Sequence, residues 1–155
     1  MNVDCINAFI SAGTLVLKQA TQQDVSTGKA FVKTTSAIED AVCLIVGLTG
    51  KIRGKVSINM DKKMALDLAS SMMGGYTVTE FDEMTSSAVG ELANMIAGNA
   101  STILYDKGIG IEITPPSVIQ GQNTIIVLDG ITQVICIPLS LAGKGTIELD
   151  ICIRE

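Results

Sequence analysis

The chain has 155 residues, 47% of them hydrophobic, and a formal net charge of -5 with no histidine. A chain of this length and composition forms a single domain that buries about two thirds of the surface of its unfolded state. The absence of histidine excludes Ser/His/Asp and Cys/His nucleophile systems and imidazole-based zinc sites. The negative charge and the scarcity of aromatic side chains argue against nucleic acid and against an anionic membrane surface as partners.

The four cysteines stand singly in apolar segments, without the CxxC spacing of redox or zinc sites. They are Cys5, Cys43, Cys136 and Cys152, and we interpret them as reduced, buried core residues. The segment from Met1 to Lys18 lacks the basic start and the cleavage site of a signal peptide, and no apolar run reaches the roughly 18 residues of a membrane span. We therefore expect a soluble, cytoplasmic protein.

The first part of the chain predicts one helix followed by strands. Apolar residues recur at helical spacing over Val3–Gln19, and apolar and polar residues alternate over Lys29–Ala37, as in a strand. Val42–Leu48 is apolar on both faces, which is typical of a central strand. Thr49-Gly50-Lys51 turns the chain and Ile52–Met60 returns as a second strand, so this pair is expected to form a hairpin.

Two further helices are predicted in the middle of the chain. Asp61 is a good N-cap for a helix over Lys62–Met73, and Gly74-Gly75 is suited to end that helix. The longest helical pattern covers Phe81–Tyr105, where Asp82 is the expected N-cap. Both helices therefore have defined starts.

The last third of the chain predicts strands. Ile109–Gly121 contains two consecutive prolines, which cannot donate to a sheet ladder, so this segment is expected to be an edge strand or a rigid extended connection. Thr124–Leu128, Thr132–Leu141 and Thr146–Arg154 are predicted strands. The last of these is the clearest, because its apolar residues occupy every second position.

The two halves of the chain resemble each other. Thr49–Gly54, followed by KVSINM, is similar to Ala142–Gly145, followed by TIELDI, and each comes after an apolar strand. We infer a helix-plus-strands unit used twice, over roughly 1–60 and 82–155, joined by the helix at 61–73. The predicted fold is α+β, with two pseudo-symmetric repeats that share a largely antiparallel sheet of about six strands covered by helices.

The helix over Phe81–Tyr105 has an unusual polar face. At roughly 100° per residue, an apolar arc faces the core and the opposite arc carries Glu91 and Asn94. The apolar arc consists of Val89, Leu92, Ala93, Ile96, Ala100 and Ile103, and the small residues around the acid and the amide are Ser87, Gly90, Ala97 and Gly98. Each glycine costs about 1 kcal/mol relative to alanine within a helix. The glycines either permit close packing inside this protein or leave room for a second protein.

Three segments together resemble a known family. The pattern Ser87-x-x-x-Glu91-x-x-Asn94 lies within SAVGELANMIAGN, is preceded by MMGG at Met72–Gly75 and is followed by ITPP at Ile113–Pro116. In these segments the chain resembles the CheC/CheX/FliY chemotaxis phosphatases, and most of all CheX, from about Leu44 to its end. The resemblance implies a CheC-like fold, hydrolysis of the aspartyl phosphate on a CheY-type response regulator, and a homodimer.

The resemblance also implies roles for particular residues. Asn94 takes the catalytic position, and Glu91 takes the acidic position that engages the regulator. A carboxamide suits this task, because its oxygen can accept from an attacking water while its NH₂ donates to a phosphoryl oxygen. The partner-binding residues would be Ser87, Gly90, Ala97 and Gly98. No cofactor or metal is expected on this chain, and Mg²⁺ is expected on the regulator.

Other interpretations stay open at this point. From spacing alone, Glu91 and Asn94 would be ordinary solvated residues of a helix exterior, and only the surrounding segments favour catalysis. The alternative function is a non-catalytic receiver-binding or assembly module, because flagellar switch proteins share the fold and lack the acid and amide. A receiver outside motility is a third possibility. Asp4 and Asn7 stand where a second site could lie, but aspartate has a shorter reach and the glycines are missing, so we expect no activity there.

Overall fold

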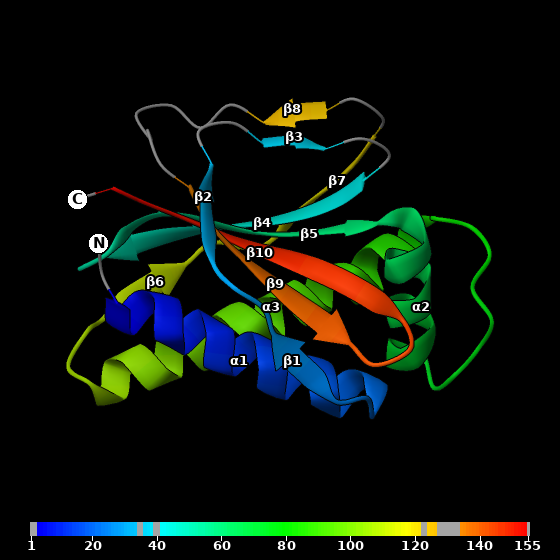
Figure 1. The fold of residues 1–155 in the computed structure, drawn as a ribbon, viewed down its shortest axis with the longest axis horizontal. Helices are drawn as coiled ribbons and strands as arrows, with labels where there is room; N and C mark the ends of the chain where they lie inside the picture. Colours follow the sequence, from blue (N-terminus) through cyan, green and yellow to red (C-terminus); the bar gives the residue numbers. More distant parts are fainter. Residues whose placement is uncertain (1–2, 34–35, 39–40, 122–123, 127–133, 155) are drawn as a thin grey trace.

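A computed structural model of the chain describes residues 3–33, 36–38, 41–121, 124–126 and 134–154. Within these residues, three helices pack on one face of a large antiparallel sheet (Figure 1). The helices are α1 (Val3–Thr21), α2 (Lys62–Met72) and α3 (Glu83–Asp106). The predicted two-layer α+β fold is confirmed. None of these helices combines the length and the apolar character that crossing a membrane requires.

The main sheet has eight strands, and every neighbouring pair is antiparallel. Six strands follow in the order β1 (Val25–Thr27), β9 (Val134–Leu141), β10 (Gly145–Arg154), β5 (Arg53–Asp61), β4 (Ala41–Gly50) and β6 (Ile111–Ile113). In addition, β2 (Phe31–Lys33) pairs with β9, and β7 (Ser117–Gly121) pairs with β4. A separate ribbon of β3 (Ser36–Ile38) and β8 (Thr124–Ile126) lies on the side of the sheet away from the helices (Figure 1).

Two hairpins form the centre of the sheet. The predicted hairpin is β4–β5, the second is β9–β10, and they meet where Val56 of β5 lies opposite Ile151 of β10. Gly54 sits at this junction with φ of +155°, and a Cβ there would collide with the carbonyl oxygen of Cys152, so the close approach of the two strands requires glycine. In the chain, α1 precedes the β4–β5 hairpin and α3 precedes the β9–β10 hairpin. The internal duplication stays a prediction.

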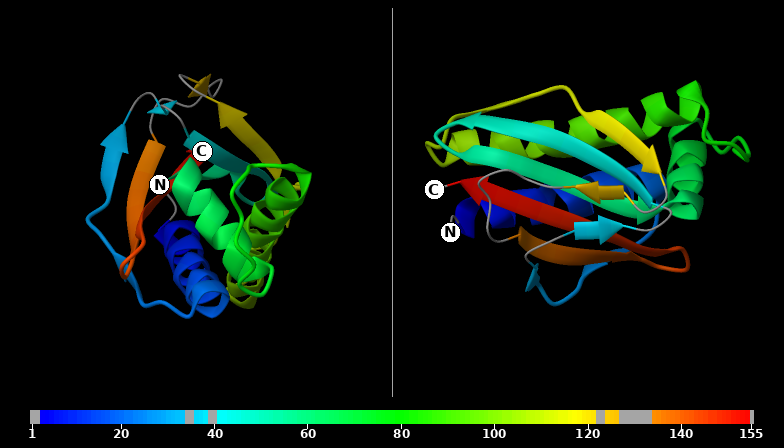
Figure 2. Two further views of the ribbon diagram at one scale, coloured as in Figure 1. Left: turned by 90° about the vertical axis from the view of Figure 1, so that its right-hand side faces the viewer. Right: turned by 90° about the horizontal axis from the view of Figure 1, so that it is seen from above.

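The hydrophobic core lies between the sheet and the helices. Every second residue of β10 points into it, and Ile147, Leu149 and Ile151 are at most 1% exposed. Helices α1 and α3 lie side by side beneath the curved sheet, and α2 packs across one end of them (Figure 2). Burying one such side chain contributes about 1.5–3 kcal/mol, so this layer fixes the position of α3 relative to the sheet.

Several predicted elements differ in their bounds or pairing. Lys29–Ala37 is not one strand of one sheet, because β2 ends at Lys33 and β3 belongs to the separate ribbon; residues 34–35 lie outside the described part. Likewise, β8 covers only 124–126 and does not join the main sheet, while 127–128 and 132–133 lie outside the described residues. The long helix begins at Glu83 rather than Phe81, because Asp82 is its N-cap.

The sheet face away from the helices carries buried polar side chains. Asp150 of β10 is 1% exposed, and its carboxylate accepts from the Asn59 side chain of β5 at 2.8 Å. Burial, which penalises the charged form, and the neighbouring Glu148 together raise the pKa of Asp150 to about 7. Cys136 and Cys152 are also buried on this face, and all four cysteines are free thiols, as predicted.

Candidate functional site

The start of α3 is fixed by hydrogen bonds at its N-cap. The Asp82 carboxylate accepts from the Thr85 amide at 2.9 Å, and the buried Thr85 hydroxyl lies 2.9 Å from both that carboxylate and the Glu80 carbonyl oxygen. The bonds from the Thr85 amide and hydroxyl lower the pKa of Asp82. The helix therefore enters the structure in a defined register just before Ser87.

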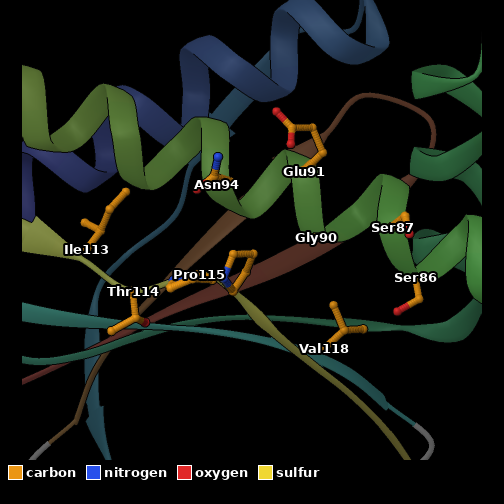
Figure 3. Close-up of a pocket in the computed structure, with 10 residues that line it drawn as sticks. Ser86, Ser87, Gly90, Glu91, Asn94, Ile113, Thr114, Pro115 and Val118 are labelled. Carbon is orange, nitrogen blue, oxygen red and sulfur yellow. The ribbon is translucent and has the colours of Figure 1, made fainter.

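The acid and the amide lie on the exposed face of α3, as the periodicity predicts. Glu91 and Asn94 are exposed on successive turns, while Val89, Leu92 and Ala93 on the opposite face are fully buried. Figure 3 shows both polar side chains on the helix side of a surface groove. The structure thus brings these two predicted residues together at one place on the surface.

The groove runs between α3 and the segment that joins β6 to β7. Its volume is about 750 Å³. Glu91 is the one charged residue among those that line it, so a partner entering here meets a single negative charge beside an amide. The lining residues are Ser86, Ser87, Gly90, Glu91 and Asn94 from the helix and Ile113, Thr114, Pro115, Pro116 and Val118 from the opposite side.

The wall opposite the helix is held by strand β4, which is the inner neighbour of the edge strands β6 and β7. The Gly47 amide donates to the Thr114 hydroxyl at 2.8 Å, and the Thr114 amide donates to the Gly47 carbonyl at 3.0 Å. A Cβ at Gly47 would lie only 3.0 Å from Thr114 Cγ2, so glycine permits this close contact. The following prolines, Pro115 and Pro116, lie between β6 and β7, where the pairing of this edge with β4 is interrupted. The edge position predicted for Ile109–Gly121 is confirmed, and this segment forms one side of the groove.

The four small residues of the helix have different positions. Ser87 is exposed at the groove, and a Cβ at Gly98 would meet nothing within 4 Å. Gly90 is buried at the base of the groove, and a Cβ there would lie 3.5 Å from Val118 Cγ2, which is an ordinary van der Waals contact. The expectation that Ala97 contributes to a partner surface is wrong, because Ala97 is 1% exposed and packs in the core.

Thr114 and Pro115 are groove residues that the sequence alone did not assign to the site. In the sequence they belong to the ITPP segment of the family resemblance and to a predicted edge strand or rigid extended connection. The signal that could have found them is the proline pair itself, since a segment excluded from the sheet ladder has to lie against something else. Which element it faces depends on the tertiary fold.

The acid and amide of the first helix have another environment. Asp4 and Asn7 are exposed on α1, and Asp4 Oδ1 lies 3.4 Å from Lys107 Nζ at the C-terminal end of α3. A carboxylate engaged by a lysine of its own chain is less available to a lysine of a partner. The absence of activity at this second place stays a prediction.

Comparison with known proteins identifies the family. A family profile described as chemotaxis phosphatase CheX matches residues 42–140, which include Glu91 and Asn94. The chain belongs to the CheX family of chemotaxis phosphatases. Over its full length, the chain is 29% identical to the CheY-P phosphatase CheX of Thermotoga maritima, and the match covers 99% of that protein. The CheX-like resemblance and the expected phosphatase class are thereby confirmed.

Solved structures show the same fold over the full chain. A CheC-like superfamily protein from Shewanella sp. PV-4 is 31% identical, with a TM-score of 0.88 and 100% of both chains covered. CheX in the CheX-CheY-BeF3-Mg complex from Borrelia burgdorferi is 34% identical, with a TM-score of 0.80, 99% of this chain and 100% of that chain covered. The predicted CheC-like fold is confirmed.

Proposed function

We propose that this protein hydrolyses the aspartyl phosphate of a phosphorylated CheY-type response regulator. The observation that carries the proposal is the exposed Glu91 and Asn94 beside the groove of α3, in a chain that belongs to the CheX family. A relative of similar length is a CheY-P phosphatase, and a relative of known structure forms a complex with CheY. An exposed helix that carries both groups can be inserted into the active site of another protein.

The chemistry asks little of this chain beyond positioning. An acyl phosphate is already activated, and Mg²⁺ with a lysine on the regulator neutralises the phosphoryl charge. The Asn94 amide oxygen accepts a hydrogen bond from water and orients it for in-line attack on phosphorus, while its NH₂ donates to a phosphoryl oxygen. The amide is uncharged, so it does not repel the phosphate.

Glu91 fixes the docking of the partner. It lies one helical turn from Asn94, and its carboxylate pairs with the regulator's active-site lysine. Neither Glu91 nor Asn94 has to change its protonation state during the reaction, which suits a chain without histidine. The wall formed by Thr114 and Pro115 limits the directions from which the partner can approach.

The wider setting of this function is the cytoplasm, where response regulators act, and a homodimer is the expected assembly. The mass of the protein in solution tests the dimer: a monomer at micromolar concentration would contradict it. The metal in the reaction is expected on the regulator and not on the α3 groove.

The decisive experiment measures dephosphorylation of a purified, phosphorylated receiver in the presence of this protein. Asn94→Ala is expected to remove the acceleration while receiver binding persists, with a loss of about 10²–10³ in rate, because the water is no longer oriented. Glu91→Ala is expected to weaken binding of the receiver, because the ion pair is lost. Asn7→Ala is the matched control, since Asn7 is also an exposed asparagine on a helix packed beneath the sheet.

The outcomes separate the two candidate functions. Unchanged dephosphorylation in both Asn94→Ala and Glu91→Ala would falsify the site. Binding of the receiver without faster phosphate loss in the unmodified protein would instead support a non-catalytic receiver-binding or assembly module.

A further inference from the structure

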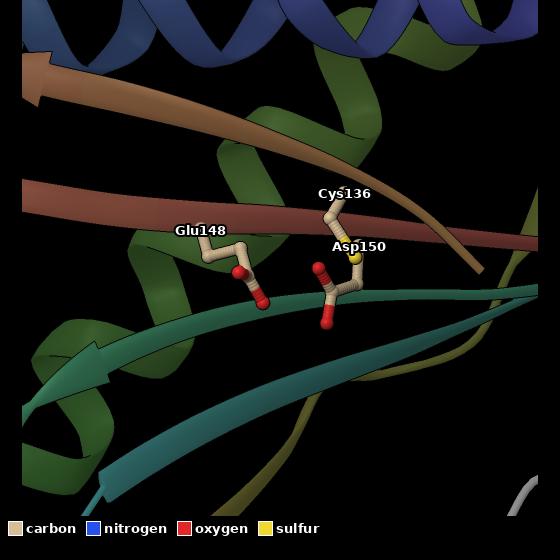
Figure 4. Close-up of side chains that lie close together, drawn as sticks. All are labelled: Cys136, Glu148 and Asp150. Carbon is tan, nitrogen blue, oxygen red and sulfur yellow. The ribbon is translucent and has the colours of Figure 1, made fainter. Parts of the chain in front are cut away.

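The sheet face away from the helices carries a second cluster of reactive side chains. It consists of Cys136 on β9 and Glu148 and Asp150 on β10, and Cys136 lies directly opposite Asp150 in the ladder. One sulfur and one oxygen from each carboxylate all lie within 4.8 Å of one another. Figure 4 shows the three side chains converging on the same space between the strands.

A second observation shows that one buried oxygen of this cluster lacks a hydrogen-bond donor. Asp150 is 1% exposed, and among the described residues its Oδ1 has no hydrogen-bond donor. The Asn59 side chain occupies only the other oxygen, donating from Nδ2 to Oδ2 at 2.8 Å, and Asn59 Oδ1 is also buried without a donor in the described part. A buried acceptor without a partner is costly, and a bound cation would satisfy the free oxygen of Asp150.

Lys33 on β2 supplies a positive charge at one side of the cluster. Its Nζ lies 2.7 Å from Glu148 Oε2 and 3.8 Å from Asp150 Oδ2, which leaves Asp150 Oδ1 unsatisfied. The Lys33 and Glu148 side chains are 25% and 27% exposed, so solvent reaches the cluster from their side. Strand β2 is held on β9 by only three residue pairs, so the lysine can move aside without disturbing the central strands.

We propose that Cys136, Glu148 and Asp150 bind a divalent cation of the Zn²⁺ class, in competition with the Lys33 ammonium. One thiolate and two carboxylates suit a borderline-soft cation, whereas Mg²⁺ and Ca²⁺ prefer oxygen ligands alone. On binding, the S–H bond of Cys136 breaks, a metal–sulfur bond forms and the thiol proton passes to solvent. Water completes the coordination on the side where Lys33 and Glu148 are exposed, and the bound ion joins β9 to β10.

The test uses Co²⁺ as a probe, because a thiolate bound to Co²⁺ gives a charge-transfer absorption in the near ultraviolet. Reduced, metal-free protein is expected to show this band after addition of one equivalent of Co²⁺. Zn²⁺ is expected to remove the band by displacing Co²⁺ and to raise the Tm of the protein. Cys136→Ala should abolish the band. Cys43→Ala is the matched control and should keep it, because Cys43 is also a buried free thiol but lies outside the cluster.

Lys33→Met is expected to increase the affinity for Co²⁺. A misfolded variant would lose affinity, so an increase cannot result from misfolding. Removing a like charge that lies 2.7 Å from Glu148 Oε2 and 3.8 Å from Asp150 Oδ2 is expected to tighten Co²⁺ binding by about tenfold or more. The absence of the band in both the unmodified protein and Lys33→Met overturns the site, as does a band of full strength in Cys136→Ala. Unchanged affinity in Lys33→Met overturns the competition with the lysine.

Discussion

Helices α3 and α1 lie side by side on the same face of the sheet, and each exposes an acid followed three residues later by an asparagine. Glu91 and Asn94 on α3 border a groove of about 750 Å³. Asp4 and Asn7 on α1 do not line this groove, and Asp4 is paired with a lysine at 3.4 Å. The same spacing of an acid and an amide therefore occurs in two different environments.

The glycines of the two helices show the same contrast. Gly13 of α1 is buried, and a Cβ there would lie 3.2 Å from Leu139 Cδ1, so this glycine serves packing on the sheet. Gly98 of α3 faces open space, and a Cβ at Gly90 would make only an ordinary contact with the wall of the groove. A candidate site thus depends on where the small residues point, and an acid and an amide alone do not make one.

Outside Glu91 and Asn94 themselves, the largest expected effect comes from loosening the wall of the groove that faces α3. Thr114→Val keeps the shape of the side chain but leaves the Gly47 amide without its acceptor, so the wall is held by one hydrogen bond fewer. We expect the unfolding free energy to fall by about 1 kcal/mol. Receiver dephosphorylation should fall roughly tenfold to hundredfold, because small misplacements of a docking surface are costly to catalysis.

The control for this prediction is Thr102→Val. The Thr102 hydroxyl also forms a hydrogen bond with the backbone, in this case donating to the Gly98 carbonyl oxygen on α3 at 3.1 Å, but Thr102 does not line the groove. It should keep the dephosphorylation rate. Full activity in Thr114→Val, together with the stability loss, would show that the wall has no part in docking.

A smaller effect, on stability, is expected from substituting Gly98 of α3 and Gly13 of α1. Gly98→Ala should raise the unfolding free energy by up to about 1 kcal/mol, because the new methyl group meets nothing and the helix gains propensity. Gly13→Ala should gain less or lose stability, because Leu139 has to move. Urea denaturation of both variants checks this. An equal gain in both would mean that Gly13 is not closely packed, and the contrast between the helices would weaken.

Features of this protein that are determined by neighbouring residues in the chain could be predicted from the sequence, whereas features that depend on tertiary contacts could not. The start of α3 and the exposure of Glu91 and Asn94 follow from the periodicity and N-cap of a single element, so they could be predicted. Ala97 was misplaced because α3 contacts α1, α2 and several strands, so its buried arc is wider than that of a helix lying on one surface. Local periodicity does not contain that information.

The groove wall and the outer ribbon could not be predicted for a related reason. Thr114 is fixed by Gly47, which lies 67 residues earlier in the chain, and no local pattern marks that contact. The alternating pattern at Lys29–Ala37 is correct for strands but does not decide which sheet they join, and the structure divides it between β2 and β3. Pairing partners of short edge segments are set by the tertiary fold.

The smallest expected effect comes from removing the lysine that engages Asp4. Both side chains of the Asp4–Lys107 pair are 51% exposed, so Lys107→Ala should change the unfolding free energy by less than about 0.5 kcal/mol. In an Asn94→Ala background, Lys107→Ala should restore no receiver dephosphorylation. The Asp4 carboxylate would be free of its lysine, but it still does not line the α3 groove and has a shorter reach than glutamate. Appearance of activity in the double variant, lost again with Asn7→Ala, would mean that one ion pair was all that kept α1 inactive. The difference between the two helices would then lie in charge and not in shape.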